Sequence, residues 1–128
     1  MTGRYNEGKK EVLAKQHKIA VIGTGAMGSI YAALMAEAGH IVWAVDTWVE
    51  QVRTINERGL QINGASGNRI VKGIQAVSNV DDAEPCDIYI IATKVSDLGA
   101  AAHAVAKVVC SSALVITIQN GLGAGERI

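Results

Sequence analysis

The sequence lacks phenylalanine, has a single proline and contains only two cysteines among its 128 residues. Two cysteines cannot build the disulfide framework of a small secreted domain, and the spacing of Cys86 and Cys110 is unlike that of a zinc site. We therefore expect no metal site. We interpret both cysteines as small buried apolar side chains of a cytoplasmic protein, because a reducing compartment keeps thiols free.

Charge of one sign and long apolar runs are also missing. Twelve Lys and Arg balance twelve Asp and Glu, so the formal net charge at pH 7 is zero. A neutral chain lacks the basic surface that binds nucleic acid or anionic lipid, so we expect neither partner. No apolar run approaches the roughly 18 residues of a membrane span, and the polar N-terminal residues do not resemble a secretory signal.

The residues that are present are those of a globular domain. Hydrophobic residues make up 49% of the chain, and 14 residues are glycine. A chain of this length normally forms one domain with its own core. The apolar patterning begins at Lys18, so we expect a flexible extension over residues 1–17 and one folded domain over residues 18–128.

Short β-branched runs alternate with stretches of helical periodicity along this domain. The patterns predict buried strands at 18–22, 41–45, 87–93 and 113–118, and helices at 26–38, 48–58 and 96–109, the last capped by Ser96. Between Leu60 and Val77, alternating apolar residues and Asn-Gly pairs predict a β-hairpin or two short strands. The order predicts an α/β fold: a Rossmann-like, doubly wound, mainly parallel sheet with a small β-hairpin insertion.

A glycine-rich turn follows the first predicted strand. The segment Gly23–Gly28 reads G-T-G-A-M-G and fits the pattern G-x-G-x-x-G, and Asp46 ends the second strand 21 residues after Gly25. Strand, turn, helix and acid together are the fingerprint of a dinucleotide site. The glycines would permit the tight turn and the approach of a pyrophosphate to the helix N-terminus. The alternative is a glycine-rich turn that binds nothing.

Asp46 also bears on the choice of cofactor. Its carboxylate would accept hydrogen bonds from ribose hydroxyls and repel a 2′-phosphate, which favours NAD(H) over NADP(H). The next residues, Thr47 and Trp48, provide no cation for a phosphate. Trp48 would cover the adenine, or it would simply pack on its own helix; the sequence favours neither reading.

Polar residues follow the last two predicted strands. They are Thr93 and Lys94 after one strand, and Gln119 and Asn120 after the other. Because the carboxyl ends of parallel strands share one edge of a sheet, we expect them near the glycine-rich turn. A lysine and an amide there would reach the nicotinamide end of a cofactor or a substrate carboxylate, although a lone lysine at a strand end is ordinarily a solvated charge.

A family resemblance rests on three segments, which read KIAVIGTGAMGSIYAALMAEAGH, IIATKVSD and ITIQNGLGAGERI. Together they resemble the N-terminal domain of the ketopantoate reductases (2-dehydropantoate 2-reductases), and the resemblance extends over residues 18–128. It implies an oxidoreductase that transfers hydride to the carbonyl of a 2-oxo acid, in pantothenate and coenzyme A biosynthesis. It also makes NADP(H) a possible cofactor, because the family typically prefers NADPH.

The resemblance implies roles for particular residues. Lys94 and Asn120 would be the catalytic residues of this chain, positioning nicotinamide and substrate. The candidate cofactor-binding residues are Gly23, Thr24, Gly25, Ala26, Met27, Gly28, Asp46, Thr47, Trp48, Thr93, Lys94 and Asn120.

Family members also carry a helical C-terminal domain with the general-acid lysine, which this chain would lack. We therefore expect cofactor binding without efficient turnover, and self-association through the surface left exposed.

Other functions remain open on the sequence alone. The chain would serve equally as the cofactor domain of another two-domain dehydrogenase, acting on hydroxy acids, glycerol phosphate or opines. It would also fit a non-catalytic NAD-binding module, or a structural remnant that binds no nucleotide.

Overall fold

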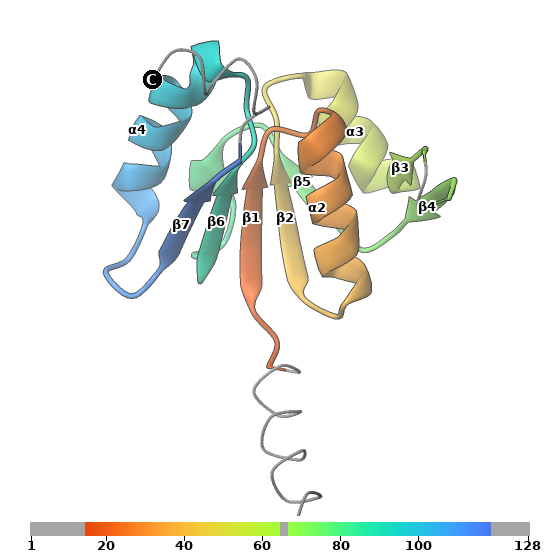
Figure 1. The fold of residues 1–128 in the computed structure, drawn as a ribbon, viewed down its shortest axis with the longest axis horizontal. Coiled ribbons are helices and arrows are strands. Elements are labelled where there is room, and N and C mark those ends of the chain that lie inside the picture. Colours follow the sequence, from red (N-terminus) through yellow and green to blue (C-terminus); the bar gives the residue numbers. More distant parts are fainter. Residues whose placement is uncertain (1–14, 65–66, 119–128) are drawn as a thin grey trace, which may run out of the picture.

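The computed structural model describes residues 15–64 and 67–118 of the chain. Its centre is a five-stranded sheet in the order β5-β2-β1-β6-β7, in which every neighbouring pair is parallel (Figure 1). The strands are β1 (Lys18–Ile22), β2 (Ile41–Val45), β5 (Gln75–Val77), β6 (Ile88–Ile91) and β7 (Leu114–Thr117). The predicted Rossmann-like fold is confirmed, and all the carboxyl ends of the strands lie at one edge of the sheet.

Two apolar layers enclose the sheet. Helices α2 (Ala26–Glu37) and α3 (Val49–Arg58) cover one face, and α4 (Leu98–Val108) covers the other (Figure 1). Alternate residues of β1 serve the two layers, with Ile19 facing α2 and Ala20 facing the α4 side. A strand buried on both faces needs apolar residues at successive positions, which explains the continuous run that predicted it.

The first predicted helix ends as its sequence indicates. Gly39 has φ of +98°, a conformation that favours glycine, and its amide donates to the Ala36 carbonyl at 3.1 Å. The His40 amide donates to Met35 at 3.1 Å, so the last carbonyls of α2 are satisfied. Just before β1, the Gln16 side chain donates to the Gly39 carbonyl at 3.0 Å. Residues 1–14 of the predicted extension lie outside the described residues.

The segment between α3 and β6 contains one strand more than the hairpin. Strands β3 (Leu60–Ile62) and β4 (Arg69–Val71) pair antiparallel, as predicted, and Arg69 ties them to Glu37 of α2 at 2.7 Å. Strand β5 instead pairs parallel with β2 and extends the main sheet. Three residues are too few for their pattern to separate a sheet strand from a hairpin arm. The connection from β5 to β6 contains one 3-10 turn, η1 (Val80–Asp82).

Two details of the α4 prediction are wrong. A 3-10 turn, η2 (Val95–Asp97), precedes the helix, so Asp97 occupies the N-cap position and no side chain, including that of Ser96, caps it. Along the helix, Ala102 is exposed and Ala104 contacts the core.

Strand β7 forms where it was predicted but is not the buried core strand that its sequence indicates. All of its residues are exposed, with Leu114 at 56% and Val115 at 43% of full exposure. It pairs only with β6 among the described residues. An apolar run shows that a strand can be buried, but whether it is buried depends on what packs against it.

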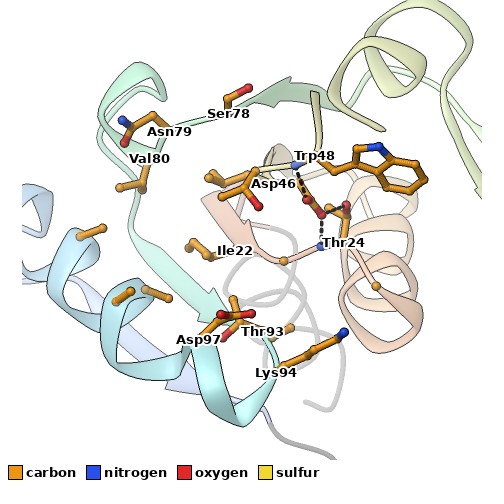
Figure 2. Close-up of a pocket in the computed structure, with 18 of the residues that line it drawn as sticks. Ile22, Thr24, Asp46, Trp48, Ser78, Asn79, Val80, Thr93, Lys94 and Asp97 are labelled. Carbon is orange, nitrogen blue, oxygen red and sulfur yellow. Dashed lines mark hydrogen bonds between the residues drawn. The ribbon is translucent and has the colours of Figure 1, made fainter. Parts of the chain in front are cut away.

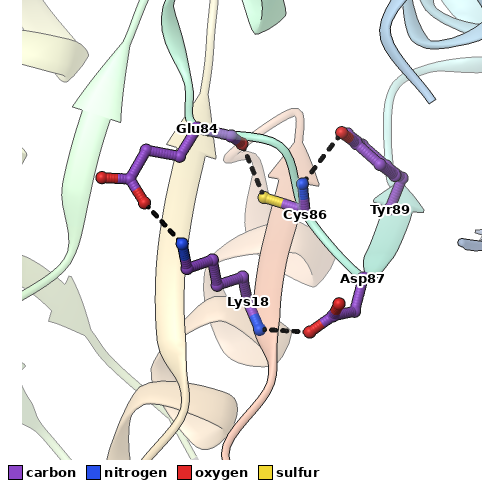
Figure 3. A network of polar contacts seen from close by, with 5 residues as sticks. All are labelled: Lys18, Glu84, Cys86, Asp87 and Tyr89. Carbon is purple, nitrogen blue, oxygen red and sulfur yellow. Dashed lines mark hydrogen bonds and ion pairs between the residues drawn. The ribbon is translucent and has the colours of Figure 1, made fainter. Parts of the chain in front are cut away.

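The two cysteines also differ from one another. Cys86 is buried near the amino ends of the strands, where its amide donates to the Tyr89 hydroxyl at 3.1 Å and its thiol to the Glu84 carbonyl at 3.2 Å (Figure 3). Burial raises the pKa of this thiol to about 11, so it stays protonated. Cys110 is exposed, which contradicts the prediction that both are buried.

Candidate functional site

A cleft of about 660 Å³ opens at the carboxyl edge of the sheet (Figure 2). Four chain segments that each follow a strand form its walls, together with one side of α4: Gly23–Gly25 after β1, Asp46–Trp48 after β2, Ser78–Val80 after β5 and Thr93–Lys94 after β6. This is where parallel α/β sheets bind ligands, because loops from neighbouring strands diverge there.

The three glycines of the G-x-G-x-x-G segment differ in why a side chain would be unfavourable at each position. Gly23 has φ of +97°, and its amide donates to the Val45 carbonyl at 2.7 Å, which joins the turn to β2. A β-carbon on Gly28 would lie 1.8 Å from the Gly23 carbonyl oxygen. At Gly25, by contrast, a β-carbon would meet nothing within 4 Å. The fold itself requires Gly23 and Gly28, whereas Gly25 keeps space open on the side of the cleft.

The N-terminus of α2 is available to an anion. Gly25 is the N-cap residue, no side chain caps the helix, and its first turn carries no acidic residue. The first helical hydrogen bond runs from the Ser29 amide to the Gly25 carbonyl at 2.9 Å. Amides before Ser29 have no partner within the helix, and the helix dipole adds to their attraction for negative charge.

Three hydrogen bonds hold the Asp46 carboxylate beside the glycine-rich turn. Its Oδ2 accepts hydrogen bonds from the Thr24 amide at 3.0 Å and the Thr24 hydroxyl at 2.5 Å, and its Oδ1 accepts one from the Trp48 amide at 2.9 Å (Figure 2). Partial burial acts to raise the pKa of Asp46, but these hydrogen bonds outweigh it. The pKa therefore lies below its ordinary value of 3.8, so the side chain is a carboxylate at neutral pH.

Several of the other predicted residues lie around the same cleft, whereas Ala26, Met27 and Gly28 form the first turn of α2 and are not among the residues that line it. Thr93 and Lys94 line it from the end of β6, and the Thr93 hydroxyl is buried with no hydrogen-bond partner in the described part of the chain. Thr47 and Trp48 also line it, and Trp48 is 65% exposed. Asn120 lies outside the described residues, as does Gln119.

Sequence reasoning missed part of the lining. Ser78, Asn79 and Val80 follow β5, and Asp97 and Ala101 belong to η2 and α4. Residues after a strand of a parallel sheet reach this edge, so assigning 75–77 to the main sheet would have indicated the first three. The others depend on the packing of α4, which leaves no motif in the sequence.

Comparison with known proteins identifies the family. The family model described as ketopantoate reductase PanE/ApbA matches residues 19–128. The chain belongs to this family. Ketopantoate reductases are NAD(P)-dependent oxidoreductases, and the family resemblance of the sequence is confirmed.

Individual relatives match over most of this chain but over a smaller part of their own. The 2-dehydropantoate 2-reductase of Pyrococcus abyssi is 33% identical over 115 residues, which make up 87% of this chain and 35% of that protein. The enzyme of that name from Nostoc is 28% identical over 116 residues, or 88% of this chain and 35% of the relative. The chain thus spans about a third of the length of these curated relatives.

Solved structures show the same relationship. A PanE/ApbA family ketopantoate reductase from Ralstonia eutropha superposes with a TM-score of 0.73 at 32% identity, covering 80% of this chain and 34% of that one. A ternary structure of D-mandelate dehydrogenase with NADH and anilino(oxo)acetate also has a TM-score of 0.73, at 29% identity, covering 85% and 35%.

The described residues include neither a membrane-spanning helix nor a group of potential metal ligands. Within 15–64 and 67–118, no helix combines the length and apolar character that crossing a bilayer requires. The same residues contain no group of three His, Cys, Asp or Glu side chains placed to hold a metal ion.

Proposed function

We propose that residues 18–128 form the dinucleotide-binding domain of a 2-oxo-acid reductase, and that this domain binds NADH more tightly than NADPH. The observation that carries the proposal is the carboxylate of Asp46, held by hydrogen bonds from Thr24 and Trp48 beside the uncapped N-terminus of α2. The helix N-terminus offers amides to the pyrophosphate, and Asp46 offers an acceptor to the adenosine ribose. The D-mandelate dehydrogenase relative, whose structure holds NADH, supports the choice of cofactor.

The rest of the cleft suits the two ends of the dinucleotide. Val45, Val80 and Ala101 contribute apolar side chains to the lining of the cleft, which would suit the adenine ring. Thr93 and Lys94 lie at the other side, near the end of β6. The buried Thr93 hydroxyl, which has no hydrogen-bond partner in the described part of the chain, and the Lys94 ammonium would there contact the nicotinamide ribose or a substrate carboxylate.

In the reaction, the bound cofactor would supply a hydride to the carbonyl carbon of a 2-oxo acid. The residues of this chain would orient the two reactants. Lys94, together with Asn120, would fix the nicotinamide end and attract the carboxylate of the substrate. Protonation of the product oxygen requires a general acid, which accelerates such reactions by about 10²- to 10⁴-fold. The family resemblance assigns this acid to a second domain, so we expect residues 18–128 by themselves to bind cofactor with little turnover.

Gly25→Val tests the site directly. Because a β-carbon at Gly25 would meet no atom of the described residues within 4 Å, the variant should fold as the wild type does. Its branched side chain would occupy the space through which the pyrophosphate approaches the helix, so NADH binding should be lost. Gly99→Ala on α4, where the added β-carbon also meets nothing within 4 Å, is the matched control.

Affinity is measured by quenching of the tryptophan fluorescence as NADH is added. Loss of binding in Gly25→Val with normal binding in Gly99→Ala supports the proposal. Normal binding in both variants would place the cofactor elsewhere and contradict it.

A further inference from the structure

Among the described residues, Thr24 is the one polar residue that is buried as a whole, with only 6% of its surface exposed. It occupies the first variable position of the glycine-rich turn, where the G-x-G-x-x-G pattern asks for no particular residue type. Its backbone is held from the helix side as well, because the Ser29 hydroxyl donates to the Thr24 carbonyl at 2.8 Å. A hydroxyl buried in a turn normally has a hydrogen-bond partner.

Within the described part of the chain, the Thr24 hydroxyl donates a hydrogen bond to Asp46 and to no other residue. Both the amide and the hydroxyl of Thr24 donate to Oδ2, from a residue 22 positions earlier in the chain. A carboxylate has about four acceptor directions. Thr24 uses two of them and the Trp48 amide uses one, so a single direction, on Oδ1, is left for a ligand.

We propose that Thr24 is a specificity-determining positioning residue: its hydroxyl fixes the Asp46 carboxylate so that one oxygen meets one ribose hydroxyl and cannot turn away from a 2′-phosphate. This inference rests on the proposed function. Asp46 lies partly exposed at the cleft. Without the bond from Thr24, its carboxylate would rotate into water when a 2′-phosphate arrives, so it would discriminate only weakly between NADH and NADPH. A fixed carboxylate keeps its charge at the ribose, where it repels the phosphate of NADPH.

Thr24→Val and Thr24→Ser separate the hydroxyl from the volume of the side chain. Valine keeps the branched shape and removes the donor, whereas serine keeps the donor and removes the methyl group. We expect Thr24→Val to lower the ratio of the NADPH Kd to the NADH Kd by about tenfold, the effect of losing one hydrogen bond to a charged group. Thr24→Ser should leave that ratio within about threefold of the wild type. A role confined to packing would predict the opposite order.

Thr54→Val is the matched control, because the Thr54 hydroxyl donates only to the Glu50 carbonyl of its own helix, away from the cleft. Its ratio should equal that of the wild type. Circular dichroism and thermal melting would verify folding, and Thr24→Ala provides a second donor-free variant if valine does not fit the turn. The ratio of the NADPH Kd to the NADH Kd should fall in Thr24→Ala by the same factor as we expect for Thr24→Val.

The outcomes distinguish this inference from the proposed function. A wild type that prefers NADH, with an unchanged ratio in both donor-free variants, overturns the role of Thr24 alone. A ratio that falls in Thr24→Ser as far as in Thr24→Val, or further, shows that the hydroxyl is not what matters and also overturns it. A wild type that binds neither cofactor, or prefers NADPH, overturns the proposed cofactor choice and this inference together.

Discussion

A β-carbon on Gly28 would lie 1.8 Å from the carbonyl oxygen of Gly23, so the first turn of α2 approaches the turn after β1 more closely than any side chain at position 28 would allow. This contact sets the helix close against the sheet and directs its N-terminus over the cleft. The amides that we propose to hold the pyrophosphate are thus positioned by the absence of one carbon atom.

Gly28→Ala should therefore destabilise the protein. The neighbouring atom is backbone and cannot rotate aside, so the helix must shift, at a cost of at least about 1–3 kcal/mol. Gly99→Ala is the control: its β-carbon has open space, and replacing a helical glycine should stabilise by about 0.5–1 kcal/mol. Urea unfolding of both variants measures the two free energies. Equal stabilities would contradict the tight contact.

Replacing Asp46 by asparagine should reverse the selection between cofactors. Loss of the charge removes a charge-assisted bond to the ribose and the repulsion of a 2′-phosphate. We expect NADH to bind about tenfold more weakly and NADPH to bind more tightly. Asp82→Asn, on the exposed turn η1, is the control and should bind both cofactors as the wild type does. A parallel loss of both affinities in Asp46→Asn would indicate damage to the fold instead.

Asp46 should also contribute stability that depends on pH. Its pKa in the folded protein lies below the ordinary value of 3.8, so folding favours the carboxylate. The contribution is fully present above pH 3.8 and is lost as the pH falls through the lowered folded value. The difference in unfolding free energy between wild type and Asp46→Asn should hold constant from pH 7 to about pH 5 and shrink below pH 3.8. A difference that grows on acidification would contradict the assigned direction.

The exposed strand β7 leads us to expect self-association of the chain. Leu114, Val115 and Ile116 place an apolar surface at the edge of the described sheet. Light scattering should show a mass that rises with protein concentration, and Val115→Lys should reduce that rise. Ile70→Lys, at an exposed apolar position on β4, is the control and should leave it unchanged. A monomeric wild type at high concentration would refute the expectation.

The part of the fold that carries the site was the most predictable from sequence. The run from β1 to β2 combines β-branched strands, helical spacing and two glycines with distinct steric roles, and each of these is a local signal. Strand β5 was missed because three residues carry too little pattern. The exposure of Leu114 was missed because burial depends on neighbours that a strand's own sequence does not specify.

For the candidate site, the sequence indicated which residues gather but not how they bond. Asp46 was predicted as an acceptor for a ligand, and Thr24 only as a member of the turn. Their two hydrogen bonds join residues 22 positions apart and depend on the register of β1 with β2, which pairs Ile22 with Val45. No motif records such a contact, so the constraint on the carboxylate was visible only in three dimensions.

The most direct test is a pair of titrations of the wild-type chain, one with NADH and one with NADPH, followed by quenching of tryptophan fluorescence and energy transfer to the reduced nicotinamide. Trp48 adjoins Asp46 in the cleft and provides the signal. Our account predicts saturable binding of both cofactors with the lower Kd for NADH. A lower Kd for NADPH, or no binding of either by the folded chain, would contradict it.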